Sequence, residues 1–313
     1  MPSKPKIIPE VMRRARRINV GDGHLLYVEE VGVPDGTPVL FLHGGPGSGC
    51  SAAQRQLFDG LRYRVIFVDQ RGAGSSVPLG GLAANTTPDL VADLEVVREA
   101  LGIRQWLLFG GSWGSLLGLA YAQLYPERTL GLVLRGIFLG SQAEIEHYVS
   151  GFQNWLLVHA PEIGLRLAST ARHALPQLAG WVLGHEQNLA LAVTRAWLNY
   201  ERSLLGEGPL SAEPDARQQA KVAIQMHYLG HHCFLGQGQL LVGVRGIRHL
   251  PAVIVQGLDD PVCPPAHAEQ LHRVWPEATW MPIPGGGHGA LEPAIARACL
   301  KGLAWVAEAA LSH

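Results

Sequence analysis

The sequence has little net charge and few charged residues. Asp, Glu, Lys and Arg make up 16% of its 313 residues, and the formal net charge is −1 at pH 7. Proteins that bind nucleic acid or acidic membranes usually carry a basic excess, so we expect neither partner. One basic cluster precedes a predicted strand and is interpreted as solvated surface; it consists of Arg13, Arg14, Arg16 and Arg17.

Long hydrophobic runs and grouped cysteines are also missing. No apolar run reaches the roughly 18 residues that cross a bilayer, and Met1–Glu10 lacks the apolar core of a signal peptide. Only four cysteines occur, far apart, at positions 50, 233, 263 and 299. This scatter matches neither a disulfide framework nor a zinc site. We therefore expect free thiols, a cytoplasmic location, no membrane partner and no bound metal.

What the sequence does contain is a series of short apolar segments separated by helical patterns. Residues 17–33 alternate around Gly21-Asp22-Gly23, which predicts a hairpin. Further strands are predicted at 38–42, 64–68, 106–109, 130–134, 252–256 and 279–283. Helices are predicted from Ser51, over 87–100 with Thr87 or Asp89 as the cap, and over 291–311. Such alternation favours a parallel sheet covered on both faces.

From about Gly140 to Leu240 the strand pattern disappears. Tryptophans at 155, 181 and 197 lie there among helical segments. We interpret this stretch as a helical insertion after the sixth strand. The predicted division is an α/β core of residues 1–140 and 241–313 and a helical cap of residues 141–240. Sites in open α/β sheets lie at the carboxyl ends of the strands, where such a cap would cover them.

The most informative motif is Gly110-Gly111-Ser112-Trp113-Gly114, which fits Gly-x-Ser-x-Gly. A predicted strand precedes it and a predicted helix follows it, which is the context of a nucleophile elbow. The elbow exposes a serine hydroxyl to a base and to backbone N–H groups that stabilise an oxyanion. Ser112 is therefore the predicted nucleophile.

Partners for this serine follow the late strands in the order acid, then histidine, that this scaffold requires. Asp259 and Asp260 follow the strand at 252–256, and both remain candidates for the acid on this pattern. His288 follows the strand at 279–283, between glycines that let a loop bring the imidazole to the serine. His288 is the predicted general base, and the aspartate would orient it.

A second glycine-rich loop, His43-Gly44-Gly45-Pro46-Gly47, follows the strand at 38–42. Its backbone has little steric bulk around it. We expect the N–H groups of Gly44 and Gly45, together with that of Trp113, to form the oxyanion hole. No phosphate-binding or dinucleotide-binding fingerprint occurs, so no cofactor is expected.

At this point the chain resembles the proline iminopeptidase (prolyl aminopeptidase) family of the α/β-hydrolase superfamily. The resemblance implies an α/β-hydrolase fold, with a mostly parallel eight-stranded sheet, helices on both faces and an inserted helical cap. In the family the acid lies three residues before a Cys-Pro pair, which selects Asp260. The matching segments are 43–47, 69–72, 110–114, 120–122, 126–128, 134–138, 200–201, 263–264 and 287–288.

The resemblance also implies a substrate. Family members remove N-terminal proline from short peptides, and two cap glutamates hold the charged imino group. Glu201 matches the first glutamate, whereas Gln225 stands at the position of the second. Phe138 would line the proline pocket. Because an amide keeps an acceptor but loses a charge, this replacement predicts weaker selection for a free N-terminus.

Three functions are compared on these residues. The first is a prolyl aminopeptidase that works through a Ser-His-Asp acyl-enzyme on a small-molecule or short-peptide substrate. The second is an esterase or amidase of the same fold with a different pocket. The third is a non-catalytic ligand-binding relative. Ser112, Asp260 and His288 argue against the third, because a binding protein does not need all of them.

Overall fold

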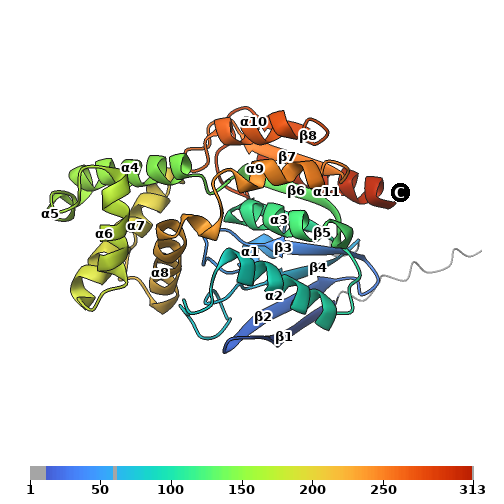
Figure 1. Cartoon of the computed structure of the whole chain (residues 1–313), viewed down its shortest axis with the longest axis horizontal. Coiled ribbons are helices and arrows are strands. Elements are labelled where there is room, and N and C mark those ends of the chain that lie inside the picture. Colours follow the sequence, from blue (N-terminus) through green and yellow to red (C-terminus); the bar gives the residue numbers. More distant parts are fainter. Residues whose placement is uncertain (1–11, 59–61, 312–313) are drawn as a thin grey trace, which may run out of the picture.

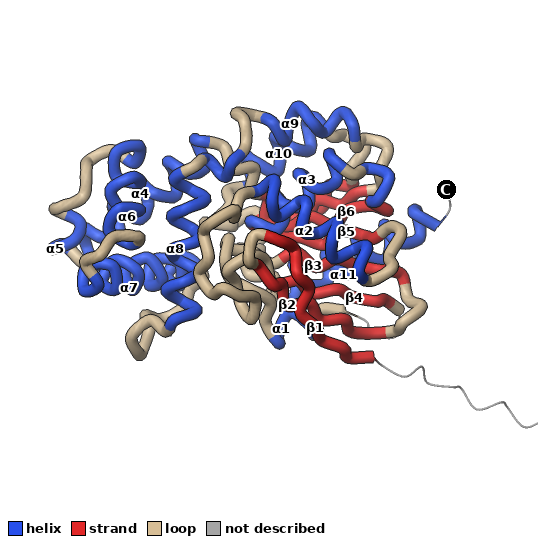
Figure 2. The backbone as a smooth tube through the Cα atoms, turned by 60° about the horizontal axis from the view of Figure 1, so that its bottom comes forward, coloured by secondary structure: helices blue, strands red, loops and turns tan. Residues whose placement is uncertain are grey.

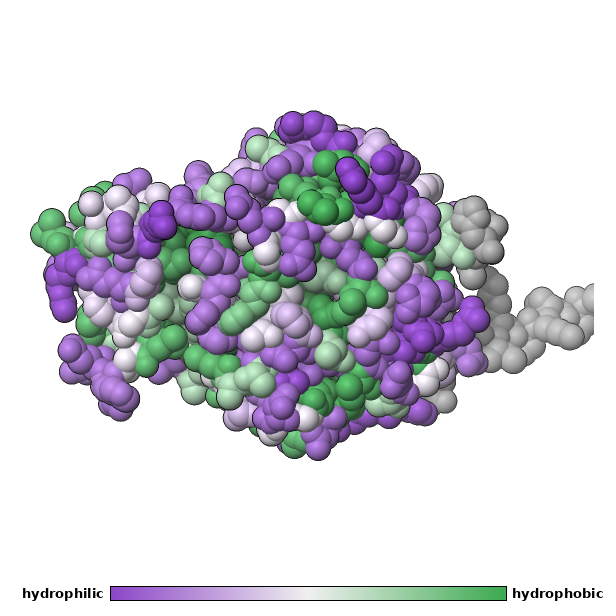
Figure 3. Space-filling model, viewed as in Figure 1, coloured by the Kyte–Doolittle hydropathy of each residue, from purple (hydrophilic) through white to green (hydrophobic). Residues whose placement is uncertain are grey.

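The computed structural model describes residues 12–58 and 62–311. Met1–Glu10, for which no signal peptide is expected, lies outside the described residues. Figure 1 shows a sheet with its flanking helices in one part of the molecule and a separate group of helices projecting from it. Figure 3 shows that hydrophobic residues on this face occur in small groups separated by hydrophilic ones.

The sheet has eight strands in the order β1-β2-β4-β3-β5-β6-β7-β8. The β1–β2 and β2–β4 pairs are antiparallel, and the remaining pairs are parallel. This confirms the predicted mostly parallel sheet, whose strands are visible in Figure 2. The strands are β1 (Met12–Gly21), β2 (His24–Gly32), β3 (Thr37–Leu42), β4 (Tyr63–Val68), β5 (Trp106–Ser112), β6 (Thr129–Ile137), β7 (Ala252–Gly257) and β8 (Thr279–Ile283).

Helices cover both faces of the sheet, as predicted. Consecutive strand residues point to opposite faces, so Leu40 and Leu42 pack with α2 and α3 while Val39 and Phe41 belong to the cluster under α11. The core helices are α1 (Ala52–Arg55), α2 (Thr87–Ala100), α3 (Trp113–Leu124), α9 (Gln239–Gly243), α10 (Pro265–Val274) and α11 (Pro293–Leu311). The sequence patterns did not predict α10.

The start of α2 corrects the predicted cap. Thr86, rather than Thr87 or Asp89, is the N-cap residue: its hydroxyl accepts from the Asp89 N–H, and the Asp89 carboxylate accepts from the Thr86 N–H. This reciprocal capping box leaves Thr87 as the first helical residue, and Pro88 follows where its missing N–H costs nothing.

The arginine cluster is exposed, in agreement with its interpretation as solvated surface, but it lies within the first strand rather than before it, because β1 already begins at Met12. Arg13 pairs with Glu29 and Arg16 with Glu30, both on β2. Each of these glutamates is almost fully buried and has a second arginine partner, so charge pairing extends the strand toward its amino end.

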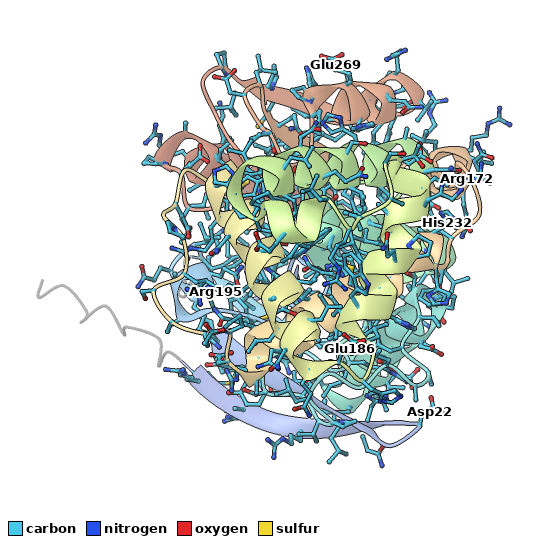
Figure 4. All side chains as sticks on the ribbon, turned by 90° about the vertical axis from the view of Figure 1, so that its left-hand side faces the viewer. Asp22, Arg172, Glu186, Arg195, His232 and Glu269 are labelled. Carbon is cyan, nitrogen blue, oxygen red and sulfur yellow. The ribbon has the colours of Figure 1, made fainter. Side chains whose placement is uncertain are left out.

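The remaining α-helices of the described residues lie between β6 and β7. They are α4 (Gln142–His159), α5 (Pro161–Gly164), α6 (Ala171–Val182), α7 (Gln187–Leu204) and α8 (Ala216–Gly230). Figure 4 views the molecule from this side, with these helices in front of the sheet. The predicted boundary at 240/241 falls inside α9, which packs on α3 of the core. The division into core and cap stays a prediction.

A buried polar loop after β4 connects the sheet to α2. Arg71 donates hydrogen bonds of 2.7 Å to each carboxylate oxygen of Asp93 on α2. Both side chains are nearly inaccessible to solvent, so the two charges depend on each other.

We expect Asp93→Asn to destabilise the fold by about 3 kcal/mol, because it leaves the buried Arg71 charge with only the more distant and exposed carboxylate of Asp22. Urea unfolding would measure this loss. The control is Glu277→Gln, which breaks the exposed Arg248–Glu277 pair and should leave the unfolding midpoint unchanged. Equal midpoints for the two variants would contradict the structural role given to Arg71.

Candidate active site

The serine elbow is held at the end of β5 by a backbone contact that only glycine permits. Ser112 has φ 56° and ψ −125°, a strained conformation for a residue with a side chain. A Cβ atom on Gly110 would lie 2.2 Å from the Gly114 carbonyl oxygen, and one on Gly114 would lie 2.2 Å from the Leu42 carbonyl oxygen. The sequence therefore forms a sharp turn that packs directly against the end of β3.

The loops after β7 and β8 bring Asp260 and His288 together. Asp260 Oδ2 lies 2.8 Å from His288 Nδ1, and Asp260 Oδ1 accepts from the N–H groups of Val262 and Cys263. Burial acts to raise the pKa of Asp260, but the contact with His288 and these backbone donors bring the pKa below its ordinary value. The carboxylate thus stays charged and accepts a hydrogen bond from the protonated Nδ1 of His288.

Asp259 takes a different place. It is exposed, and its backbone N–H donates to the Gly286 carbonyl at 2.9 Å. The geometry therefore pairs Asp260 rather than Asp259 with His288. This arrangement supports the choice that the family resemblance made between two adjacent aspartates.

Two charged residues that the sequence analysis did not select fix the histidine loop. The Glu292 carboxylate accepts from the N–H groups of Gly287 at 2.8 Å and Gly289 at 2.7 Å, on either side of His288. The Arg135 guanidinium donates to the His288 carbonyl oxygen. The side chains of Asp260, Glu292 and Arg135 therefore hold His288 and its loop in one place.

The environment of His288 favours its neutral form. Burial lowers its pKa, the contact with Asp260 opposes this, and the Arg135 charge lowers the pKa further. Because Nδ1 faces a carboxylate, it carries the proton, and Nε2 keeps a lone pair that can accept one. The neutral imidazole is the form that a general base needs.

Ser112 and His288 line the same cavity of about 320 Å³. Among the described residues no hydrogen bond joins their side chains. The Cys263 thiol, whose pKa is raised by burial, lines the cavity with them. Contacts between a nucleophile and its base often tighten only when substrate binds.

The candidate oxyanion loop is tied to the elbow through buried polar groups. His43 Nε2 accepts from the Gln70 N–H at 3.1 Å, so its Nδ1 carries the proton and donates to the Gly44 carbonyl at 2.9 Å. The Gln70 side-chain oxygen in turn accepts from the indole N–H of Trp113 at 2.8 Å. Burial lowers the pKa of His43, which keeps this histidine neutral as the network requires. Gly45, with φ 119°, completes the turn.

The three predicted substrate-binding residues line the same cavity: Phe138 directly follows β6, whereas Glu201 and Gln225 come from the helices between β6 and β7. Glu201 lies on α7 and Gln225 on α8. The Gln225 amide donates to Glu201 Oε1 at 2.7 Å, and its oxygen accepts from the Trp197 indole at 3.0 Å. The structure thus brings together the cap residues that the resemblance suggested.

Sequence reasoning missed Lys221, whose Nζ lies 2.6 Å from Glu201 Oε2. Lys221 precedes Gln225 by four residues, so both lie on one face of α8. That spacing was the signal available in the sequence. Around Glu201 the cavity therefore presents one carboxylate and one ammonium group, where the family pattern implied two carboxylates.

Within residues 12–58 and 62–311, no group of three or more His, Cys, Asp or Glu side chains could hold a metal ion. No helix in this part of the chain is long and apolar enough to cross a membrane.

Comparison with known proteins decides the family. Residues 37–294 match the model of the alpha/beta hydrolase fold family. A proline iminopeptidase of Xylella fastidiosa is 41% identical over 285 residues, covering 88% of this chain and 90% of the relative. One from Neisseria gonorrhoeae is 40% identical over 294 residues, covering 91% and 93%. The chain belongs to the proline iminopeptidase family of α/β hydrolases. This confirms the resemblance stated on the motifs.

A solved member also shares the fold. The structure of a proline iminopeptidase from Mycobacterium smegmatis aligns with a TM-score of 0.64, covering 96% of this chain and 99% of that one. The identity is 19%, so this likeness concerns the fold alone.

We expect Asp260→Asn to reduce kcat by about 10⁴-fold, because the amide no longer stabilises the imidazolium or selects the reactive tautomer. Asp259→Asn changes an exposed neighbour and should stay within about twofold of the parent. Steady-state kinetics on a reactive ester would compare the two variants. A larger loss of kcat in Asp259→Asn than in Asp260→Asn would assign the acid to Asp259.

The pH profile offers an independent test of the histidine environment. The neutral imidazole is the active form, so kcat/KM should fall with acidity only below the ordinary histidine pKa of 6.5. Arg135 lowers the pKa of His288 and Glu292 raises it. Arg135→Gln should therefore move the acidic limb to higher pH, and Glu292→Gln should move it to lower pH. If both variants shift the acidic limb in the same direction, the cause is a loosened histidine loop and not the charges of Arg135 and Glu292.

Proposed function

We propose that this protein is a serine hydrolase that releases N-terminal proline from short peptides. The observation that carries the proposal is the Glu201 carboxylate, which projects from the cap into the cavity that Ser112 and His288 line. A carboxylate at that place can form charge-assisted hydrogen bonds with the charged nitrogen of an N-terminal residue, although here it would share its oxygens with Lys221 and Gln225. The names of the relatives at about 40% identity agree with this substrate.

Acylation follows from the positions of the side chains. Ser112 attacks the prolyl carbonyl carbon while His288 Nε2 takes the hydroxyl proton. The carbonyl oxygen becomes negative and accepts from the backbone N–H groups of Trp113 and the Gly44-Gly45 segment. Asp260 stabilises the imidazolium that forms, which then gives its proton to the leaving amine.

Deacylation repeats these steps with water. His288 Nε2 removes a proton from the water molecule, whose oxygen attacks the prolyl ester of Ser112. The tetrahedral species collapses, proline leaves with a free carboxylate, and the proton returns to the serine oxygen. Phe138 lines the cavity beside these groups and is the proposed contact for the pyrrolidine ring.

A second candidate function has its own supporting observation. Both oxygens of Glu201 already accept from donors of the chain itself, Lys221 and Gln225. A cavity whose carboxylate is occupied in this way also suits an esterase or amidase that acts on an uncharged acyl group. For the peptidase, we propose a cytoplasmic location, which the four free cysteines support.

The test is a comparison of kcat/KM on three substrates: prolyl-naphthylamide, its N-acetylated form and a short-chain nitrophenyl ester. We expect turnover of the free prolyl amide. Ser112→Ala should abolish turnover of all three while the thermal unfolding curve stays unchanged. Fast ester cleavage without prolyl amide turnover would favour the second candidate, and activity in Ser112→Ala would overturn the elbow assignment.

A further inference from the structure

The Glu201 carboxylate is occupied by the protein itself. Lys221 Nζ lies 2.6 Å from one oxygen, and the Gln225 amide nitrogen lies 2.7 Å from the other. A substrate ammonium that binds Glu201 would have to share these oxygens and lie beside the like charge of Lys221. Lys221 therefore competes, within the molecule, for the group that is proposed to recognise the substrate.

The orientation of Gln225 follows from its other neighbour. An indole N–H can only donate, so the side-chain oxygen of Gln225 faces Trp197 and its NH₂ group faces Glu201. Gln225 is buried and cannot turn its oxygen toward a substrate without leaving the Trp197 donor unpaired. In this position it acts as a donor toward Glu201 rather than as a second acceptor for an amine.

Lys221 is held in place by the packing of α8 against the active-site loop. A Cβ atom on Gly47 would lie 3.2 Å from the Lys221 Cα, which shows how closely the two backbones approach. The side chains of Lys221 and Glu201 are 24% and 16% exposed, so water screens their attraction only in part. The ion pair is therefore a built part of the cavity wall.

Arg135 and Glu144, which also line the cavity, do not change the net charge around the Glu201–Lys221 pair. Arg135 donates to the His288 carbonyl, at the catalytic end. Glu144 accepts from the backbone N–H groups of Leu139 and Ser141. With these groups engaged elsewhere, the charges of Glu201 and Lys221 cancel at the cap end of the cavity.

We propose that Lys221 is a specificity-determining residue that takes the place of the substrate ammonium on Glu201. The cavity then accepts prolyl groups whose nitrogen is acylated and uncharged almost as well as those with a free N-terminus. This inference rests on the proposed function, because it concerns the acyl group that the same serine would receive. It predicts a substrate class broader than free N-terminal proline.

Two different substitutions test the charge argument. Lys221→Met removes one positive charge, and Gln225→Glu adds one negative charge. Each variant therefore changes the net charge at the cap end of the cavity from zero to −1. The double variant reaches −2. A preference set by charge should therefore rise in both single variants and rise again in the double variant.

The measurement is the ratio of kcat/KM for prolyl-naphthylamide to that for N-acetylprolyl-naphthylamide. We expect a ratio near one in the parent and at least about tenfold higher in Lys221→Met, mainly through a lower KM for the free amine. Gln225→Glu should shift the ratio in the same direction even if Lys221→Met folds poorly. Lys301→Met, which removes an exposed lysine from α11, is the matched control and should keep the parent ratio.

The outcomes separate this inference from the function on which it rests. If the parent cleaves prolyl-naphthylamide and the ratio stays within twofold in both Lys221→Met and Gln225→Glu, the role of Lys221 is overturned and the peptidase stands. If the ester is cleaved but neither prolyl amide is turned over by any variant, the proposed function fails, and the inference fails with it.

Discussion

The contact between the elbow and the end of β3 is the constraint on which the site depends. Gly114 passes so close to the Leu42 carbonyl that no side chain fits between the two backbones. This approach places Ser112 beside the Gly44-Gly45 segment, since that segment continues directly from β3. The proposed nucleophile and the proposed oxyanion donors are therefore positioned by the same backbone contact, without any side chain of the helices between β6 and β7.

Around this contact, three consecutive residues after β4 each hold a different part of the site. Asp69 accepts from the N–H groups of Cys50 and Ser75, Gln70 joins His43 to Trp113, and Arg71 anchors α2 through Asp93. None of them lines the cavity with Ser112. The segment 69–72, one of those on which the family resemblance was stated, therefore orients the loops that carry the proposed catalytic groups.

Whether a feature can be predicted from the sequence depends on how far apart along the chain the interacting residues lie. The strands, and the strand and helix that flank Ser112, are local patterns of apolar residues and glycines, and β5 and α3 confirm the latter two. The choice between Asp259 and Asp260 needed a family comparison, because both follow the same strand. Lys221 and Glu292 were missed since their importance comes from partners on other elements, which a periodic pattern does not reveal.

The charged first strand has a consequence for the molecule as a whole. β1 lies at one end of the strand order, so among residues 12–58 and 62–311 no strand pairs with one side of its backbone. Such an edge invites another chain to add a strand. Arg14 and Arg17 are exposed on β1 beside the paired Arg13 and Arg16, and an approaching strand would have to strip water from several cations. The arginines of β1 therefore have two effects. Arg13 and Arg16 complete the ion pairs of the buried β2 glutamates, and the whole cluster opposes edge-to-edge aggregation.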